Sequence, residues 1–342
     1  MVELNGKKIL VTFLMHLGDL TLTTPFIHAL RKAAPDARIT MLVDEKLKDV
    51  VLFNPYLDEV VTIDKKGRDN SILSLWACSR HLSKLDFDVL INLHPNERCS
   101  FIDAMTSVKL RTGTTHKIFK CFWDVFTPLD RSMHAADMYL DVLQQLGVQD
   151  LSNNGLEIFP GEEHFLEAEL FWQEQNITDQ DKLIGFNIGS AVPTKRWPPE
   201  RFAEVADIFA AKGYKTVFFG GPMDEEMVAE ATGYMQTRPI IATGHFAIGG
   251  LAAAMRRCCL IITNDSGPMH VAISQNVPIV AMYGPSNPKL YGPYTKDAVI
   301  VTAQPPCQGC ADGMKHSCDD LQCMSRMTVE QVVEAADTML NK

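Results

Sequence analysis

Residues 260–272 of the chain read Leu-Ile-Ile-Thr-Asn-Asp-Ser-Gly-Pro-Met-His-Val-Ala. The apolar and β-branched residues at 260–263 predict a buried parallel strand, which the Asn-Asp-Ser-Gly-Pro run ends. Pro268 suits the first turn of a helix, and Met269 and Val271 continue that helix. The stretch therefore predicts a strand, a tight turn and a helix.

This junction has the features of a seat for a pyrophosphate. The first N–H groups of the helix and its dipole favour an anion, and Gly267 lets a ligand approach the main chain closely. Asp265 and Ser266 also have a simpler interpretation, as caps of the helix. His270, one turn further on, adds a titratable ring beside Asp265 at a sheet edge where ligands bind, which favours a site.

The same order of strand and helix recurs in both halves of the chain. The expected strands are 8–14, 38–43, 59–63, 89–93, 182–188, 215–219, 240–242, 260–263 and 278–283. The expected helices are 71–84, 134–146, 199–212, 224–235, 250–256 and 329–340, with two more that contain residues 26–30 and 165–172. This alternation predicts an α/β protein with a mostly parallel sheet in each half. The polar stretch 149–161 is the expected linker between them.

The composition is that of a globular protein, with 46% hydrophobic residues over a length of 342 that favours two domains. No apolar run approaches the length of a transmembrane helix and the start lacks a signal peptide, so a cytoplasmic location is expected. The net charge of −10 disfavours nucleic acid as a partner. Residues 98–120 are locally basic, which indicates either a solvated face or a surface for an anionic acceptor.

Four of the nine cysteines lie close together, at Cys307, Cys310, Cys318 and Cys323. One C-x-x-C pair with two further thiols would suffice for a tetrahedral zinc site, although the second pair is more widely spaced than usual. The other five cysteines are scattered, and we expect them to be small buried hydrophobic residues.

Polar residues follow the first expected strand of the second half. Ser190, Thr194 and Lys195 offer hydroxyl donors and a positive charge that would suit a phosphate. The alternative is a basic loop that Trp197 anchors by packing.

Acidic residues follow the strand at 215–219. A carboxylate at this place, from Asp224 or Glu225, could accept the hydroxyls of a ribose. The same residues could instead only complement the dipole of the helix that they begin.

In the first half, Asp19 follows the first strand. Its carboxylate could be the general base for an alcohol acceptor, or it could cap the next helix. Gly18 stands alone, without the G-x-G-x-x-G pattern, so we do not predict NAD. His94 and Arg98 follow another strand and so lie at the same edge.

Asp86 and Asp88 form a D-x-D pattern, which in other proteins binds a metal. They precede the strand at 89–93, at the end of the sheet opposite to where ligands bind. We therefore interpret them as the start of a strand.

Taken in order, several motifs resemble glycosyltransferase family 9, which contains the ADP-heptose:lipopolysaccharide heptosyltransferases. These motifs are Gly18-Asp19 with Thr24-Pro25, Lys195-Arg196-Trp197-Pro198, Gly220-Gly221-Pro222 and the run 264–270. The resemblance covers nearly the whole chain. His16, before Leu17-Gly18-Asp19, departs from the better-known heptosyltransferases and leaves the acceptor open.

The resemblance implies a GT-B fold, with two Rossmann-like, doubly wound parallel-sheet domains facing across a cleft. Residues 1–155 would bind the acceptor, residues 156–326 would bind the nucleotide sugar, and residues 327–342 would form a helix that returns to the first domain. The implied reaction is an inverting, single-displacement transfer of a heptose from ADP-heptose to the inner core of lipopolysaccharide. Its acceptor would be an anionic lipid-linked saccharide at the inner-membrane surface.

The resemblance also implies roles for single residues. Asp19 would be the base and Lys195 would neutralise the leaving ADP. The implied donor-binding residues are Ser190, Thr194, Lys195, Asp224, Glu225, Asp265, Ser266, Gly267 and His270, and the acceptor-binding residues are His16, His94, Arg98, Arg111 and Lys117. No cofactor is required, apart from a possible structural zinc. The alternatives are a nucleotide-sugar 2-epimerase of the same fold and a non-catalytic nucleotide-sugar-binding protein.

Overall fold

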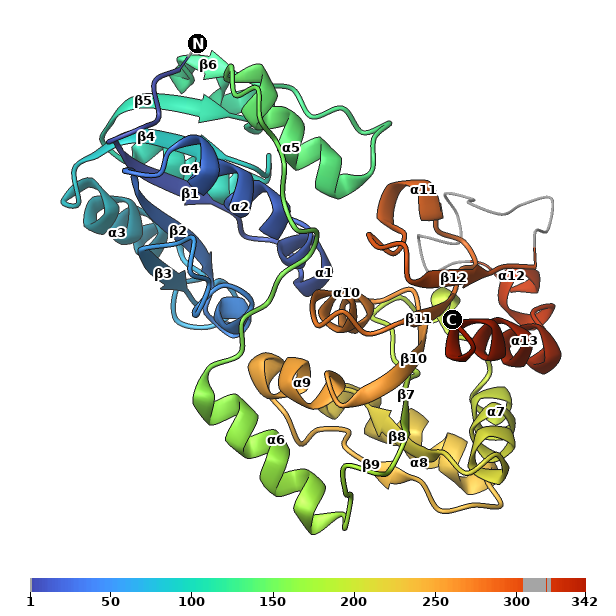
Figure 1. Cartoon of the computed structure of the whole chain (residues 1–342). Helices are drawn as coiled ribbons and strands as arrows, with labels where there is room; N and C mark the ends of the chain where they lie inside the picture. The colour runs from blue at the N-terminus through green and yellow to red at the C-terminus, as the bar shows by residue number, and fades with distance from the viewer. Residues whose placement is uncertain (1, 304–317, 319–320) are drawn as a thin grey trace. The chain divides into compact units, whose positions relative to one another are not determined.

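The computed structural model describes residues 2–303, 318 and 321–342, and they form two units. Unit 1 comprises residues 1–159 and unit 2 comprises residues 160–342. Each unit contains a six-stranded parallel sheet (Figure 1). The expected α/β class, with one parallel sheet in each half of the chain, is therefore confirmed.

The sheet of unit 1 has the strand order β3-β2-β1-β4-β5-β6. Its strands are β1 (Lys8–Thr12), β2 (Arg38–Asp44), β3 (Glu59–Ile63), β4 (Phe87–Asn92), β5 (Val108–Gly113) and β6 (Val125–Phe126). Its helices are α1 (Leu17–Thr21), α2 (Thr24–Ala33), α3 (Ile72–Ser83), α4 (Glu97–Met105) and α5 (Ala135–Gln145), with 3₁₀ helices η1 (Glu45–Val50) and η2 (Lys117–Phe122). This order is that of a Rossmann fold, in which the direction of winding changes between β1 and β4.

Unit 2 repeats this topology, with the order β12-β11-β10-β7-β8-β9. Its strands are β7 (Leu183–Asn187), β8 (Lys215–Phe219), β9 (Ile240–Ile241), β10 (Cys258–Asn264), β11 (Ile279–Met282) and β12 (Ala298–Val301). Its helices are α6 (Glu162–Glu174), α7 (Pro199–Ala211), α8 (Glu225–Tyr234), α9 (Ile248–Met255), α10 (Gly267–Ser274), α11 (Pro288–Tyr291), α12 (Gln322–Ser325) and α13 (Val329–Leu340), with 3₁₀ helices η3 (Pro193–Lys195) and η4 (Pro222–Asp224). Its winding changes between β7 and β10.

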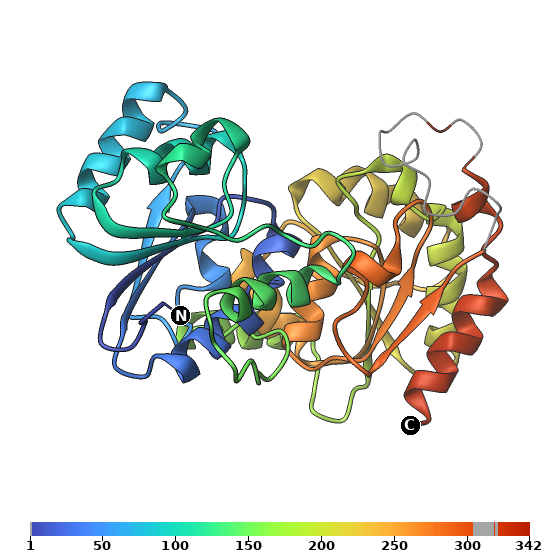
Figure 2. The same cartoon turned by 90° about the horizontal axis from the view of Figure 1, so that it is seen from above.

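The C-terminal helix contributes to the core of unit 2. Helix α13, the red helix at the C-terminus in Figure 2, packs against β10, β11, β12 and α7 of unit 2. Its apolar stripe, including Val332 and Ala336, is fully buried in the core of unit 2. Because burial of this stripe excludes apolar surface from water, α13 is a structural part of unit 2.

Unit 1 extends to Phe159, within the expected linker 149–161. Leu156 and Ile158 are buried, and the backbone N–H of Glu157 donates to Thr24 Oγ1 at 3.0 Å. The carboxylate of Glu157 lies 2.8 Å from His28 Nδ1. The last residues of the linker are therefore fixed to unit 1.

No helix in the described part of the chain is both long enough and apolar enough to span a membrane.

Candidate active site

The central feature of unit 2 is an ion pair at the change of winding between β7 and β10. Lys195 Nζ lies 2.7 Å from Asp265 Oδ2, and the two side chains are only 13% and 7% exposed. Lys195 comes from η3, after β7, whereas Asp265 follows β10. The carboxyl edge of the sheet at such a change of winding is the usual ligand site of this fold.

Further groups hold the carboxylate of Asp265. Ser286, in the loop after β11, donates its hydroxyl to Asp265 Oδ2. Tyr283 is buried, and burial together with the negative charge of Asp265 keeps the pKa of its hydroxyl well above the ordinary value. Because Asp265 faces Lys195 and Ser286, and Ser266 makes no side-chain cap, the interpretation of these two residues as mere caps of α10 is wrong.

The loop that carries Lys195 is fixed at both ends. Asn264 donates from Nδ2 to Ile188 O at 2.8 Å and accepts from the backbone N–H of Trp197 at 3.1 Å. The indole N–H of Trp197 donates to Met327 O at 3.1 Å, and its ring is fully buried. Trp197 therefore does anchor the loop, as the alternative interpretation held, but the anchored loop also presents Lys195 to Asp265.

The other expected donor-binding residues gather at the same edge. Ser190 donates to Asp265 O at 3.4 Å, and Asn187 donates to Ser266 Oγ at 2.8 Å. Thr194 and His270 are buried, with 5% and 4% of their surfaces exposed. The predicted helix start is confirmed, since α10 begins at Gly267 with Pro268 in its first turn.

Asp224 and Glu225 take different positions beside this edge. Asp224 Oδ2 accepts from the N–H of Gly221 at 2.9 Å, so this carboxylate closes η4. A Cβ atom on Gly189 would lie 2.2 Å from Asp224 Oδ1, so a side chain at this position would require the carboxylate of Asp224 to move. Glu225 is exposed and lies toward Gly244, whose added Cβ would be 2.8 Å from Glu225 Oε1.

In unit 1, Asp19 lies in the first turn of α1, after β1. The helix begins at Leu17 with His16 at its N-cap position, so the alternative that Asp19 caps this helix is wrong. Asp19 is half-buried and His16 is exposed. Both lie at the carboxyl edge beside the change of winding between β1 and β4.

Lys65 fixes the loop that leads to Asp19. Its ammonium donates to Leu14 O at 3.1 Å and to Met15 O at 2.8 Å, and lies 3.1 Å from Asp44 Oδ2. The side chains of Lys65 and Asp44 are only 12% and 7% exposed. This buried charge thus ties the ends of β2 and β3 to the segment before Asp19.

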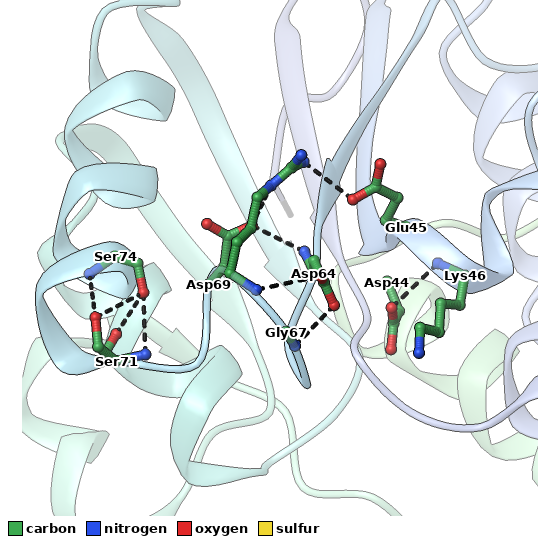
Figure 3. Close-up of polar contacts among 9 residues, drawn as sticks. Asp44, Glu45, Lys46, Asp64, Gly67, Asp69, Ser71 and Ser74 are labelled. Atoms are coloured by element: carbon green, nitrogen blue, oxygen red, sulfur yellow. Dashed lines mark hydrogen bonds and ion pairs between the residues drawn. The ribbon is translucent and has the colours of Figure 1, made fainter.

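The segment after β3 is itself built around two carboxylates (Figure 3). Asp64 Oδ1 accepts from the N–H of Gly67 at 2.9 Å, and Asp69 Oδ2 accepts from the N–H of Asp64 at 2.9 Å. A Cβ atom on Gly67 would lie 2.0 Å from Asp64 Oδ2, so a larger residue would displace this turn. Ser71 and Ser74 then cap α3 reciprocally.

His94 lies beside these groups, after β4. Burial lowers its pKa to about 4, helped by the positive charges of Arg131, His16 and Lys65. Its ring stands edge-on to Phe13, with 5.8 Å between the ring centroids. His94 is therefore a neutral imidazole at neutral pH.

The remaining expected acceptor residues are distributed differently. Arg98 donates to Lys65 O and to Asn70 Oδ1, so it joins the group at the carboxyl edge. Lys117 is exposed in η2, which follows β5. Arg111 donates to the carbonyls of Asp103 and Thr106 at the far end of α4, so the structure does not bring it together with His16 and His94.

The D-x-D pair has a structural explanation. Asp88 is the second residue of β4, accepts from the N–H of Lys8 at 2.9 Å and lies 2.6 Å from Lys109 Nζ. These contacts hold its pKa below the ordinary value. The interpretation of this pair as the start of a strand is confirmed.

Two of the four clustered cysteines, Cys307 and Cys310, lie outside the described residues. Cys318 is half-buried, and Cys323 is buried in the core of unit 2. Among the described residues, no group of three or more His, Cys, Asp or Glu side chains is arranged to hold a metal. Zinc binding by this segment stays a prediction.

Sequence reasoning did not single out Lys65, Asp44 or Ser286. Each follows or ends a strand at the carboxyl edge, so its place in the β-α order was a usable signal. Their partners are distant in sequence, and only the fold brings them together.

Residues 75–318 match the model of glycosyltransferase family 9 (heptosyltransferase). The chain is similar to lipopolysaccharide heptosyltransferase 3 of Escherichia coli (strain K12), with 24% identity over 297 residues, covering 82% of this chain and 84% of that protein. The solved structure of the glycosyl transferase family 9 from Veillonella parvula DSM 2008 matches with a TM-score of 0.95 and 53% identity, covering 99% of both chains.

The structure of E. coli ADP-heptose lps heptosyltransferase II is also similar, with a TM-score of 0.79, 22% identity and 98% of both chains covered. This likeness concerns the fold, which is GT-B with two Rossmann-like domains.

Proposed function

The chain belongs to glycosyltransferase family 9, the heptosyltransferase family, and we propose that it transfers a heptose from ADP-heptose to the inner core of lipopolysaccharide. The observation that carries the proposal is the buried pair of Lys195 and Asp265 at the start of α10. A positive charge, hydroxyl donors and free helix N–H groups there suit a diphosphate.

In the proposed donor site, Lys195 neutralises the diphosphate, with Ser190 and Thr194 as hydroxyl donors. The backbone at Ser266 and Gly267 approaches the phosphates, and Asp265 and His270 contact the sugar. Asp224 already accepts the N–H of Gly221, whereas Glu225 is exposed, so we assign the ribose to Glu225. Asp224 would shape the loop beside it.

On the acceptor side, we propose that Asp19 is the general base. Lys65 supports this assignment because it fixes the carbonyls of Leu14 and Met15, just before Asp19, and a catalytic group must be held precisely. His16, neutral His94, Arg98 and Lys117 would bind the anionic saccharide. Arg111, which caps the end of α4, contributes to the stability of unit 1.

The proposed reaction is a single displacement. The acceptor hydroxyl oxygen forms a bond to the anomeric carbon while the bond from that carbon to the diphosphate oxygen breaks, and the configuration inverts. Asp19 takes the hydroxyl proton, and ADP leaves with the electron pair. Lys195 and the donors around α10 stabilise the negative charge that develops on ADP, which is the largest contribution expected in such a site.

The test is turnover of ADP-heptose with a heptose-deficient core saccharide, with the product's anomeric configuration determined by NMR. Inverted heptosyl product supports the proposal, and absence of transfer from ADP-heptose contradicts it. Incubation of the protein with the donor alone distinguishes the two alternative functions. A 2-epimerase would convert the donor without an acceptor, and a binding protein would bind it without turnover.

A further inference from the structure

Unit 1 carries a group of exposed apolar side chains that the proposed reaction does not use. On α3, Ile72, Leu73 and Trp76 are 67%, 74% and 52% exposed. On η2, Ile118 and Phe122 are 61% and 43% exposed. We propose that these five residues form a membrane-docking surface that binds an anionic phospholipid bilayer.

The spacing of the three residues on α3 places them on one side of the helix. Ile72 and Trp76 are four residues apart and Leu73 and Trp76 three apart, so they share a side of the helix. The reciprocal capping of Ser71 and Ser74 fixes the start of this helix and thereby this side (Figure 3). The apolar side chains are thus presented by an ordered turn.

The topology brings η2 to the same edge of the sheet. Helix α3 begins after β3 and η2 follows β5, so both the first turn of α3 and η2 lie at the carboxyl edge of the parallel sheet. Helix α4 packs against both. This is also the edge that carries His16, Asp19 and His94. A bilayer bound here would present its headgroups near the residues proposed to bind the saccharide.

The chemistry favours a lipid surface over a protein partner. Trp and long aliphatic side chains partition into the interface of a bilayer, and cations beside them attract anionic headgroups. Exposed cations on or beside α3 and η2, at Lys66, Arg80, Lys117 and Lys120, outnumber the exposed acids Glu97 and Asp124 beside them, although the whole chain has a net charge of −10. This concentration of positive charge complements an anionic membrane.

The inference rests on the proposed function, because an enzyme bound to the bilayer meets its acceptor there only if that acceptor is lipid-linked. The two can still be tested separately. Flotation of the full chain with vesicles of phosphatidylethanolamine, with and without phosphatidylglycerol, measures docking. Transfer to a core saccharide freed of its acyl chains measures chemistry without a membrane.

We expect the wild type to float with the vesicles that contain phosphatidylglycerol. The double variant Leu73→Ser/Trp76→Ser should lose about tenfold or more of this binding, because it removes apolar surface that the bilayer would cover. Lys66→Glu/Lys120→Glu should weaken binding and reduce its dependence on salt. Leu166→Ser/Leu170→Ser removes similarly exposed leucines from α6 of unit 2 and should float like the wild type.

The surface is refuted if the wild type does not float, or if the α6 variant loses as much binding as the α3 variant. It is also refuted if light scattering shows a dimer that Leu73→Ser/Trp76→Ser dissociates, because the face would then join two copies of the chain. Turnover of the Leu73→Ser/Trp76→Ser variant on the acyl-free saccharide should equal that of the wild type. If the wild type lacks turnover yet floats, the proposed function fails and the surface stands.

Discussion

Lys195 Nζ and Asp265 Oδ2 lie 2.7 Å apart, and both side chains are almost entirely buried. A diphosphate that reaches Lys195 must therefore compete with this carboxylate for the ammonium. Because Ser286 also donates to Asp265, the carboxylate keeps a hydrogen bond when the ammonium turns to a ligand. The pair thus links the stability of unit 2 to its proposed donor chemistry.

Removing one member of this pair is expected to destabilise the protein more than removing both. Lys195→Met and Asp265→Asn should each lower the free energy of unfolding, by roughly 3–5 kcal/mol where a buried charge is left alone. The double variant should lose less than either single variant, because it leaves no charge alone. Chemical unfolding of the four proteins checks this, and strictly additive losses would show that the two groups are not coupled.

Asp19→Asn should lower kcat by roughly 10²–10⁴-fold, because it removes a general base but keeps the shape of the side chain. Affinity for ADP, measured by calorimetry, should stay near the wild-type value. Stopped assays with ADP-heptose and a core saccharide give the rate. A variant that turns over at the wild-type rate would remove Asp19 from the mechanism.

His94 should make the protein sensitive to acid. Its pKa is lowered from 6.5 to about 4 in the folded state, so the unfolded chain binds its proton more readily. The stability that this provides is complete above about pH 6.5 and is lost as the pH falls toward 4. In His94→Gln, the free energy of unfolding should fall less over this interval. Parallel acid profiles for the two proteins would contradict the lowered pKa.

Asp103 should act in the opposite direction. Burial raises its pKa from 3.8 to about 7, against the hydrogen bond from Thr12, so the folded state favours its protonated form. Stability is therefore lost as the pH rises from 3.8 toward 7. The amide oxygen of Asp103→Asn can still accept from Thr12. The free energy of unfolding of this variant, relative to that of the wild type, should therefore rise by roughly 2–4 kcal/mol over this pH interval. Thermal unfolding of both proteins at pH 5 and pH 8 measures this change. A stability difference between variant and wild type that is the same at both pH values would contradict the raised pKa of Asp103.

The β-α order of the chain could be predicted because most strands are continuous apolar runs. The bounds of β8 and α13 agree with the expected ones. Strand β5 was not predicted, because Lys109 and Arg111 alternate with apolar residues and made the stretch look like a basic surface. In the fold, Lys109 pairs with Asp88 and Arg111 caps α4, so both charges are satisfied.

For the site, the residues around Lys195 and Asp265 could be predicted from their places after strands. Their direct contact could not, because 70 positions separate η3 from the turn after β10 and only the adjacency of β7 and β10 joins them. Lys65 is a similar case, since its carbonyl partners at Leu14 and Met15 belong to a different strand's loop.

The contacts of Glu157 with His28 and Thr24 have a practical consequence for protein engineering. Because Glu157 contacts His28 and Thr24 of the Rossmann fold that precedes it, a fragment ending at residue 159 would keep these contacts. Such a fragment is expected to fold when expressed alone. A fragment that ends at residue 150 would lose the contacts of Glu157 with His28 and Thr24. Acceptor saccharides and vesicles could then be studied on this half of the enzyme in isolation.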